Sequence, residues 1–273
     1  MDLSDVIELR LPGFSAEDTF FCGQCFRWRR ADGGYDGVIG ANRVFVRVCG
    51  DTLTAEGCGE EQLREYFDLG TDYTALQALF CRDETLRRAV SFAPGIRVLR
   101  QPLFEALVTF ILSQNNNIPR IAGIVERFCG CFGEDAGGRR AFPTPCALSG
   151  IAEQDLAPLR CGFRAGYLAD AFGYFCRGEI DEQALRRLPL DEARAQLMRI
   201  RGVGPKVADC ALLFGAGRHD AFPQDVWVRR MMQTFYPRGL PDDILPYAGI
   251  AQQYLFHYAR SSGFFAAAKG ARS

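Results

Sequence analysis

The chain has 273 residues, of which 48% are hydrophobic and 24% charged, and this is the usage of an ordinary globular protein. The composition excludes a disordered, collagenous or low-complexity protein, and the length corresponds to roughly two domains. Because 32 basic and 33 acidic side chains leave a net charge of −1, any nucleic-acid site must be a local feature of the surface.

Residues 1–100 are predicted to form an α+β domain with a twisted antiparallel sheet. Short segments separated by Gly and Asp turn signals predict strands over 6–11, 25–30, 35–40 and 43–49. In the last of these, valines occupy every second position, which indicates a strand with one buried face. Asp32-Gly33-Gly34 and Gly40-Ala41-Asn42 predict hairpin turns. Helical patterns follow over 60–69, 74–81 and 84–93.

Residues 101–273 are predicted to form an all-helical domain, because the hydrophobic period changes to 3.6 residues. Polar and glycine residues over 133–138 predict a surface loop between two of the helices. The predicted helices run from Pro102 to Ser113, from Ile118 onward, and over 164–177, 190–200, 206–216, 226–235 and 245–260. The fold class is therefore α+β, with a small mixed domain followed by a larger helical one.

Residues 190–216 contain two predicted helices joined by the short segment Gly202-Val203-Gly204. Both glycines permit a positive φ and a close approach of a ligand, and Pro205 suits the first turn of the second helix. The free N–H groups at that helix start can hold a phosphate without reading the base sequence. A plain helix–helix turn, with glycine for geometry alone, explains these residues equally well.

Lys206 and Asp225 are the candidate catalytic pair. Lys206 stands in the first helical turn, where burial and the positive end of the helix dipole both favour the neutral, nucleophilic amine. Asp225 precedes the helix predicted over 226–235 and is placed to cap it. A surface lysine and a simple helix cap are the alternatives for these two residues.

The eleven cysteines do not form a convincing metal motif. Cys22-Gly23-Gln24-Cys25 has the Cys-x-x-Cys spacing, but a zinc site needs a second pair and an iron–sulfur cluster needs a tight run. We interpret the cysteines as small core residues in a reducing compartment. Met1–Asp5 lacks a basic start followed by an apolar stretch, so no secretion signal is expected, and no apolar run approaches a membrane span.

Several motifs together resemble the helix–hairpin–helix (HhH-GPD) DNA glycosylases, and within them the 8-oxoguanine DNA glycosylase/lyases. The resemblance extends from residue 22 to residue 256. It is carried by Cys22-Gly23-Gln24-Cys25-Phe26-Arg27-Trp28, Ser113-Gln114-Asn115-Asn116-Asn117-Ile118-Pro119-Arg120-Ile121, Cys161-Gly162-Phe163-Arg164-Ala165, Gly202-Val203-Gly204-Pro205-Lys206-Val207-Ala208-Asp209-Cys210, Pro223-Gln224-Asp225-Val226 and Gln252-Gln253-Tyr254-Leu255-Phe256. The hairpin alone is common among DNA-binding proteins, whereas the whole set is specific.

The resemblance implies a bifunctional enzyme that flips 8-oxoguanine out of duplex DNA, preferentially opposite cytosine. Lys206 would attack the sugar C1′, form a Schiff base and nick the strand by β-elimination, with Asp225 stabilising positive charge on the sugar. In the base pocket, the Gly23 carbonyl would accept the N7–H of the base, Gln252 would read its Watson–Crick edge, and Cys210 and Phe256 would sandwich it. Taken alone, Phe256 is better explained by core packing on the helix predicted over 245–260.

The resemblance also implies contacts outside the base pocket. Asn115, Arg120 and Arg164 would bind the orphaned cytosine, and Phe163 would fill the gap in the duplex, although a polar turn that caps a helix also explains the asparagines. Gly202, Gly204, Val207 and Trp227 would contact DNA phosphates. Three residues depart from the family pattern and are expected to loosen the preference for the opposite base: Arg201 for proline, Phe163 for tyrosine and Trp227 for histidine.

No redox cofactor or catalytic metal is expected. The backbone carbonyls of Met198, Ile200 and Val203 would hold a structural monovalent or Ca²⁺ ion at the hairpin, as in relatives. The expected partner is double-stranded DNA containing 8-oxoguanine, with no membrane, and the protein is expected to be a monomer. It would act in the cytoplasm (nucleoid) of a prokaryote or in the nucleus of a eukaryote.

Two other functions remain open from the sequence. One is a helix–hairpin–helix glycosylase for another damaged base, although an aromatic pocket for alkylated bases does not need Lys206. The other is a non-catalytic DNA-binding module, which would have no use for Asp225 and Gln252 together.

Overall fold

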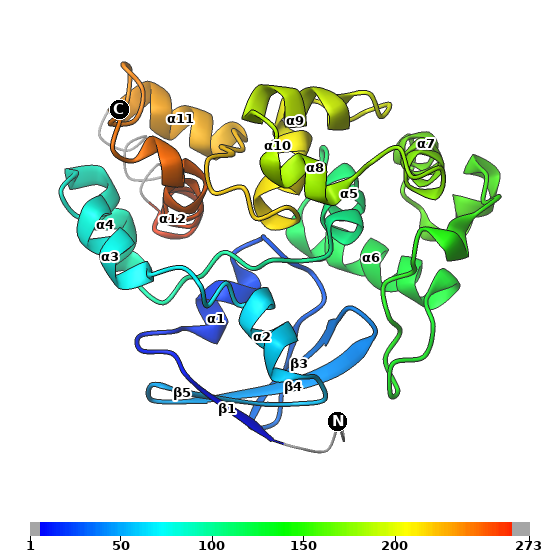
Figure 1. Cartoon of the computed structure of the whole chain (residues 1–273), viewed down its shortest axis with the longest axis horizontal. Coiled ribbons are helices and arrows are strands. Elements are labelled where there is room, and N and C mark those ends of the chain that lie inside the picture. Colours follow the sequence, from blue (N-terminus) through cyan, green and yellow to red (C-terminus); the bar gives the residue numbers. More distant parts are fainter. Residues whose placement is uncertain (1–5, 264–273) are drawn as a thin grey trace.

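A five-stranded antiparallel sheet lies at one end of the molecule in the computed structural model, which describes residues 6–263 (Figure 1). The strands are β1 (Ile7–Arg10), β2 (Arg29–Ala31), β3 (Gly34–Ile39), β4 (Asn42–Cys49) and β5 (Thr52–Glu56), in the spatial order β1-β5-β4-β3-β2. Gly33 and Gly40 both have positive φ, so the two predicted hairpin turns are confirmed. Strand β5, which the sequence analysis missed, pairs with both β1 and β4.

The buried face of the sheet follows from the alternation in β4. Val44 and Val46 are fully buried there, whereas Arg43 and Arg47 point outward. Two helices, α1 (Ala16–Phe21) and α2 (Glu60–Tyr66), cover this face, and Phe20 joins the valines in one core. The sheet and these helices form the smaller of the two main cores.

The larger core is helical. Its helices are α3 (Tyr73–Phe80), α4 (Glu84–Phe92), α5 (Leu103–Leu112), α6 (Ile118–Phe132), α7 (Arg164–Cys176), α8 (Glu182–Arg187), α9 (Leu190–Met198), α10 (Pro205–Phe214), α11 (Val226–Phe235) and α12 (Ala248–Ser261). Every position of α5 is buried, and α5 packs along α10 with Phe110 stacked on Phe214 at 5.2 Å between ring centroids. The predicted α+β class is therefore confirmed.

The two cores do not divide the chain at residue 100. Helices α3 and α4 precede that position but pack into the helical core, where α4 lies beside α12 (Figure 1). Residues 1–5 and 264–273, at the outer ends of the two predicted domains, lie outside the described part of the chain. Met1–Asp5, on which the expectation of no secretion signal rests, lies among these residues.

The loop over 133–141 returns to the sheet and links the two cores. Arg139 is buried there and forms an ion pair of 3.0 Å with Asp36 on β3. Burial favours the neutral carboxyl of Asp36, but hydrogen bonds from Arg43, Arg29 and Arg139 outweigh it and hold the pKa of this group below its ordinary value. Gly137 and Gly138 are exposed as predicted for a surface loop, whereas Gly133 is half-buried, and the basic end of the loop anchors the helical core to the sheet.

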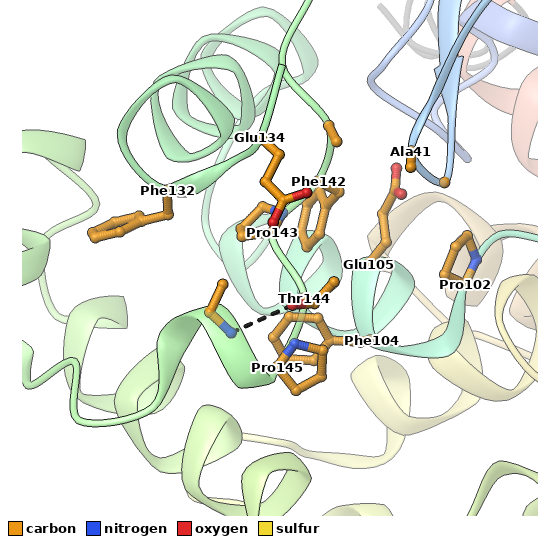
Figure 2. A pocket seen from close by; sticks show the side chains of 13 residues that line it. Ala41, Pro102, Phe104, Glu105, Phe132, Glu134, Phe142, Pro143, Thr144 and Pro145 are labelled. Carbon is orange, nitrogen blue, oxygen red and sulfur yellow. Dashed lines mark hydrogen bonds between the residues drawn. The ribbon is translucent and has the colours of Figure 1, made fainter. Parts of the chain in front are cut away.

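A cavity of about 210 Å³ lies where the β3–β4 turn meets the helical core. Phe104, Phe132 and Phe142 line it, and Figure 2 shows the Glu105 side chain extending toward Ala41 at that turn. Burial raises the pKa of Glu105 to about 7, against the opposing effect of Arg27. None of the residues lining this cavity belongs to the predicted site. Within residues 6–263, no helix combines the length and apolarity needed to cross a membrane.

Candidate active site

The hairpin between α9 and α10 has the predicted geometry at one of its two glycines. Gly202 has a φ of +80°, and a Cβ placed on it would lie 2.3 Å from the ring of Tyr167 on α7. Gly204 is extended instead, with φ −93°, so only Gly202 adopts the positive φ that both glycines permit. It is the N-cap of α10, and a Cβ there would meet open space, which leaves the helix start accessible to a ligand.

The start of α10 offers backbone donors at this accessible surface. Pro205 begins the helix, and Ala208 N donates to Gly204 O at 3.0 Å. Val207 is the residue before Ala208, and its N–H has no backbone acceptor among the described residues. Together with the dipole of the helix, it can bind a phosphate.

Lys206 lies half-buried in the first turn of α10, facing α5. Its Nζ donates to Ser113 Oγ at 3.2 Å and lies 5.0 Å from the centroid of the Phe110 ring. Ser113 Oγ in turn donates to the Phe110 carbonyl at 2.7 Å, so its lone pairs are left to accept from the lysine. This side chain is held in place, which a freely solvated surface lysine is not.

Cys210 and Asp225 complete the group around Lys206. Burial raises the pKa of Cys210 to about 11, while the Lys206 ammonium beside it acts in the opposite direction. Asp225 is the N-cap of α11, where its Oδ1 accepts from Val228 N at 2.8 Å, and its charge also acts on Cys210. The predicted cap is confirmed, and the same carboxylate and Lys206 both act electrostatically on Cys210.

Gly23 brings the sheet domain to this group. Its φ is +95°, and a Cβ would lie 3.0 Å from Ile118 Cδ1 and 3.3 Å from Phe256 Cε1. Only glycine fits this backbone and this space. Phe256 is half-buried on α12, so it is not a fully enclosed core side chain. Gly23 therefore meets Phe256 where the sheet domain contacts the helical core.

The neighbours of Gly23 fix its backbone. Cys22 Sγ accepts from Gln253 Nε2 at 2.9 Å, across the junction with α12. Gln24 Nε2 donates to Arg97 O at 2.8 Å, and Gln24 Oε1 accepts from Leu99 N at 2.8 Å. Because both flanking side chains are buried and hydrogen-bonded, the carbonyl of Gly23 is preorganised.

Gln252 supplies an unsatisfied acceptor to the site. Its side chain is 4% exposed, and its Oε1 has no hydrogen-bond partner within residues 6–263. A buried acceptor without a donor costs about 1–3 kcal/mol, so this amide is poised for a ligand that carries N–H groups.

The comparisons with known proteins agree with this geometry. Residues 6–107 match the family model described as 8-oxoguanine DNA glycosylase, N-terminal domain, and residues 108–239 match that of the HhH-GPD superfamily base excision DNA repair protein. The chain belongs to this glycosylase family. The predicted family is thereby confirmed.

Three relatives of this glycosylase cover nearly the whole chain. A probable N-glycosylase/DNA lyase of Methanothermobacter thermautotrophicus is 30% identical, over 93% of this chain and 97% of its own. The solved structure of MBOgg1 with a low-affinity DNA ligand is 40% identical, with TM-score 0.87 over 94% of this chain and 96% of that one. An 8-oxoguanine glycosylase/lyase of Clostridium acetobutylicum, solved with double-stranded DNA containing cytosine opposite 8-oxoguanine, is 35% identical, with TM-score 0.85 over 96% and 100%.

The three adjacent asparagines of this glycosylase have separate roles. Asn117 caps α6 by accepting from Arg120 N at 3.0 Å, and Asn116 Nδ2 donates to Leu112 O at the end of α5. Asn115 is exposed at φ +47°, and its side chain has no hydrogen bond to any part of the chain described. The capping alternative is thus correct for Asn117, while Asn115 and the exposed Arg120 side chain are available to DNA.

Arg164 holds this turn in place. Its guanidinium donates to the carbonyls of Gln114, Asn115 and Cys161, and the side chain is buried. It also lies 4.4 Å from the ring of Phe163, which is 54% exposed. Arg164 therefore positions both the asparagine turn and the aromatic side chain, and its predicted contact with cytosine stays untested.

The remaining predicted residues lie around the hairpin. Trp227 is partly exposed in the first turn of α11, and the backbone N–H of Arg201 donates to Asp170 Oδ2 at 2.7 Å. Ile200 O accepts from Val203 N at 3.0 Å and retains a second lone pair, so a cation can still bind to the carbonyls of 198, 200 and 203. All eleven cysteines are free thiols, and the described residues contain no cluster of three metal-ligating side chains.

Sequence reasoning assigned no role to several side chains that shape the pocket. Ser113 and Gln253 lie inside the quoted motifs, but their contacts join residues far apart in the chain. Arg260, whose Nη1 would lie 3.4 Å from a Cβ on Gly23, carried a detectable signal. It follows Phe256 by four residues and so shares its helix face.

Proposed function

We propose that the protein is a bifunctional DNA glycosylase and abasic-site lyase that removes 8-oxoguanine from duplex DNA. The observation that carries the proposal is the position of Lys206: a held amine beside Cys210 and Asp225, in the domain junction that also contains Gly23 and Phe256. Repair chemistry on a base requires extrusion from the duplex, and a pocket at a domain junction can receive it.

The proposed reaction begins with attack of the Lys206 amine on C1′ of the sugar. The C1′–N9 bond breaks, its electron pair leaves with the base, and the base takes up the proton lost by the new aminium. Opening of the sugar ring gives a Schiff base. Removal of a C2′ proton then expels the 3′-phosphate by β-elimination, and hydrolysis frees the lysine. Asp225 stabilises the positive charge on the sugar.

Recognition of the base follows from the pocket. The Gly23 carbonyl accepts N7–H, which 8-oxoguanine has and guanine lacks. Gln252 Oε1, left without a donor in the described chain, accepts from the N1–H and N2–H groups of the base. Phe256 and Cys210 stack on its two faces. Guanine would leave the Gly23 acceptor unpaired, which costs about 1–3 kcal/mol.

The opposite strand is proposed to meet Asn115, Arg120 and Phe163. Asn115 and Arg120 donate to cytosine, Phe163 enters the gap left by the flipped base, and Arg164 supports them. Gly202, Gly204, Val207 and Trp227 contact phosphates. The Met198, Ile200 and Val203 carbonyls that form the proposed ion site carry no formal charge, and this favours a weakly bound monovalent ion over Ca²⁺.

The test measures base release and strand nicking on duplexes with 8-oxoguanine opposite each of the four bases, and on a duplex with an alkylated adenine. We expect release of 8-oxoguanine, fastest opposite cytosine, followed by a nick 3′ to the lesion. Release of the alkylated base alone would instead establish a glycosylase for another lesion. Binding without release of either base would leave a non-catalytic DNA-binding module.

A further inference from the structure

Arg260 presents a positive charge to the pocket from the last full turn of α12. Its Nη1 would lie 3.4 Å from a Cβ on Gly23, and its Cζ lies 5.3 Å from the centroid of the Phe256 ring. Nη2 donates to the Phe21 carbonyl at 3.4 Å. The guanidinium therefore lies against the same backbone and the same aromatic ring that the proposed function assigns to the flipped base.

No carboxylate among residues 6–263 forms an ion pair with Arg260. In the same part of the chain, its one hydrogen bond goes to a neutral carbonyl at long range. A guanidinium has five N–H donors, so most of them remain available. Burial lowers the pKa of Arg260, while the nearby Cys22 and Asp225 act in the opposite direction. Arginine stays protonated in proteins even when its pKa is lowered.

The opposite charges of Arg260 and Asp225 match the two charges that the reaction develops. When the C1′–N9 bond breaks, the sugar becomes positive and the departing purine becomes negative. Asp225 acts electrostatically on Cys210, beside the Lys206 amine that would attack the sugar, whereas Arg260 lies against Gly23 and Phe256, which would contact the base. Fixed charges aimed at the charges that develop in a transition state are among the strongest catalytic effects.

We propose that Arg260 is a catalytic residue that stabilises the negative charge of the departing base. The inference rests on the proposed function, since it assumes that the base stacks between Cys210 and Phe256 with its N7–H on the Gly23 carbonyl. The electron pair of the broken bond stays on the purine while the guanidinium is beside it. The purine then takes the proton released by the aminium formed at Lys206.

A structural role for Arg260 is the alternative, because a basic residue in the last turn of a helix also stabilises the helix dipole. Two substitutions separate these roles. Arg260→Lys keeps a positive charge, whereas Arg260→Met keeps much of the apolar length and removes the charge. Arg187→Met, which removes an exposed arginine on α8, controls for the change in the net charge of the protein.

The experiment measures single-turnover release of 8-oxoguanine, β-elimination on a duplex with a preformed abasic site, and Kd for a duplex with 2′-fluoro-8-oxoguanosine, which resists cleavage. For Arg260→Met we expect base release to slow about 100-fold. The abasic-site reaction, which has no leaving base, should stay within about threefold, and so should Kd. Arg260→Lys should recover most of the base-release rate, and Arg187→Met should match wild type.

Three results would overturn the inference. Base release by Arg260→Met within about threefold of wild type would show that the charge does not act on the leaving base. Equal losses in base release and abasic-site cleavage would indicate a structural role, as would a large fall in melting temperature. A loss confined to Kd would make Arg260 a binding residue only. If wild type itself releases no 8-oxoguanine, the proposed function fails first.

Discussion

Lys206 and Ser113, which are 93 residues apart in the chain, are joined by a hydrogen bond of 3.2 Å between Nζ and Oγ. The bond connects the first turn of α10 to the residue that ends α5, at the place where these two buried helices pack together. Because Ser113 also donates to Phe110 O, its acceptor lone pairs are oriented toward the amine. The hydroxyl therefore aims the lysine before any substrate is bound.

Replacing Ser113 with alanine should slow base excision without unfolding the protein. The amine would lose the acceptor that orients it, and misplacement of a reacting group lowers the rate, here by about tenfold. Single-turnover rates and melting temperature measure the two effects. Ser149→Ala, at an exposed serine, is the control. An unchanged rate in Ser113→Ala would show that the lysine is oriented by other contacts.

Asp225→Asn separates the helix cap from the charge. Asparagine caps helices about as well as aspartate, so the free energy of unfolding should change by less than about 1 kcal/mol. Excision should nevertheless fall about 100-fold, since the carboxylate that stabilises the sugar cation is gone. The matched control is Asp181→Asn, at the N-cap of α8, which should alter neither property. Excision by Asp225→Asn at the wild-type rate would reduce Asp225 to a cap.

The two hairpin glycines should respond differently to alanine. Gly202→Ala combines a positive φ with a Cβ placed 2.3 Å from the Tyr167 ring, so we expect a loss of about 2–4 kcal/mol in urea unfolding. Gly204→Ala has extended backbone and open space, so its stability should stay within about 1 kcal/mol. Its added methyl group should weaken DNA binding at the helix start. Equal destabilisation by both substitutions would contradict this difference.

Glu105 should make the protein less stable as the pH rises. Its folded-state pKa of about 7 lies above the ordinary 4.5, so the folded protein binds the extra proton between these values. The stabilisation of the folded state by protonated Glu105 is complete below about pH 4.5 and is lost as the pH rises through 7. The free energy of unfolding should fall by an amount on the order of 3 kcal/mol over this range. Glu105→Gln should remove it.

Urea unfolding of wild type and Glu105→Gln at pH 5 and pH 8 measures how the free energy of unfolding of each protein changes with pH. The pH effect should be smaller in Glu105→Gln, and the variant should gain most stability relative to wild type at pH 8. An identical pH dependence in the two proteins would mean that Glu105 does not titrate between these values.

The long strands and helices were predictable from the sequence, because an element that buries one face carries apolar residues at a regular spacing. The alternation in β4 and the apolar stripe of α6, which includes Ile121 and Phe128, correspond to buried faces. Helix α10 begins at Pro205, one residue before its predicted start at 206. Helices α1 and α8 were missed because six residues are too few to show a helical period. Strand β5 forms a hairpin with β4 through the two-residue turn Gly50-Asp51, a local signal that was overlooked, whereas its pairing with β1 is long-range.

The candidate site was predictable mainly through motifs. The resemblance identified Lys206, Asp225, Gly23 and Phe256, and the structure brings the elements that carry them to one junction. Contacts between side chains and backbone carbonyls leave no pattern in a sequence. The three carbonyls bound by Arg164 could therefore be found only in the structure. The extended backbone of Gly204 is a similar case, since glycine adopts many conformations.

The most direct test of the account is reductive trapping of the lysine on a duplex with 8-oxoguanine opposite cytosine. Borohydride reduces a Schiff base to a stable amine, so wild type should give a covalent protein–DNA band on a denaturing gel. Peptide mapping should place the adduct on Lys206, and Lys206→Gln should bind the duplex but give no band. A band of equal intensity from Lys206→Gln, or an adduct on another residue, would contradict the central claim.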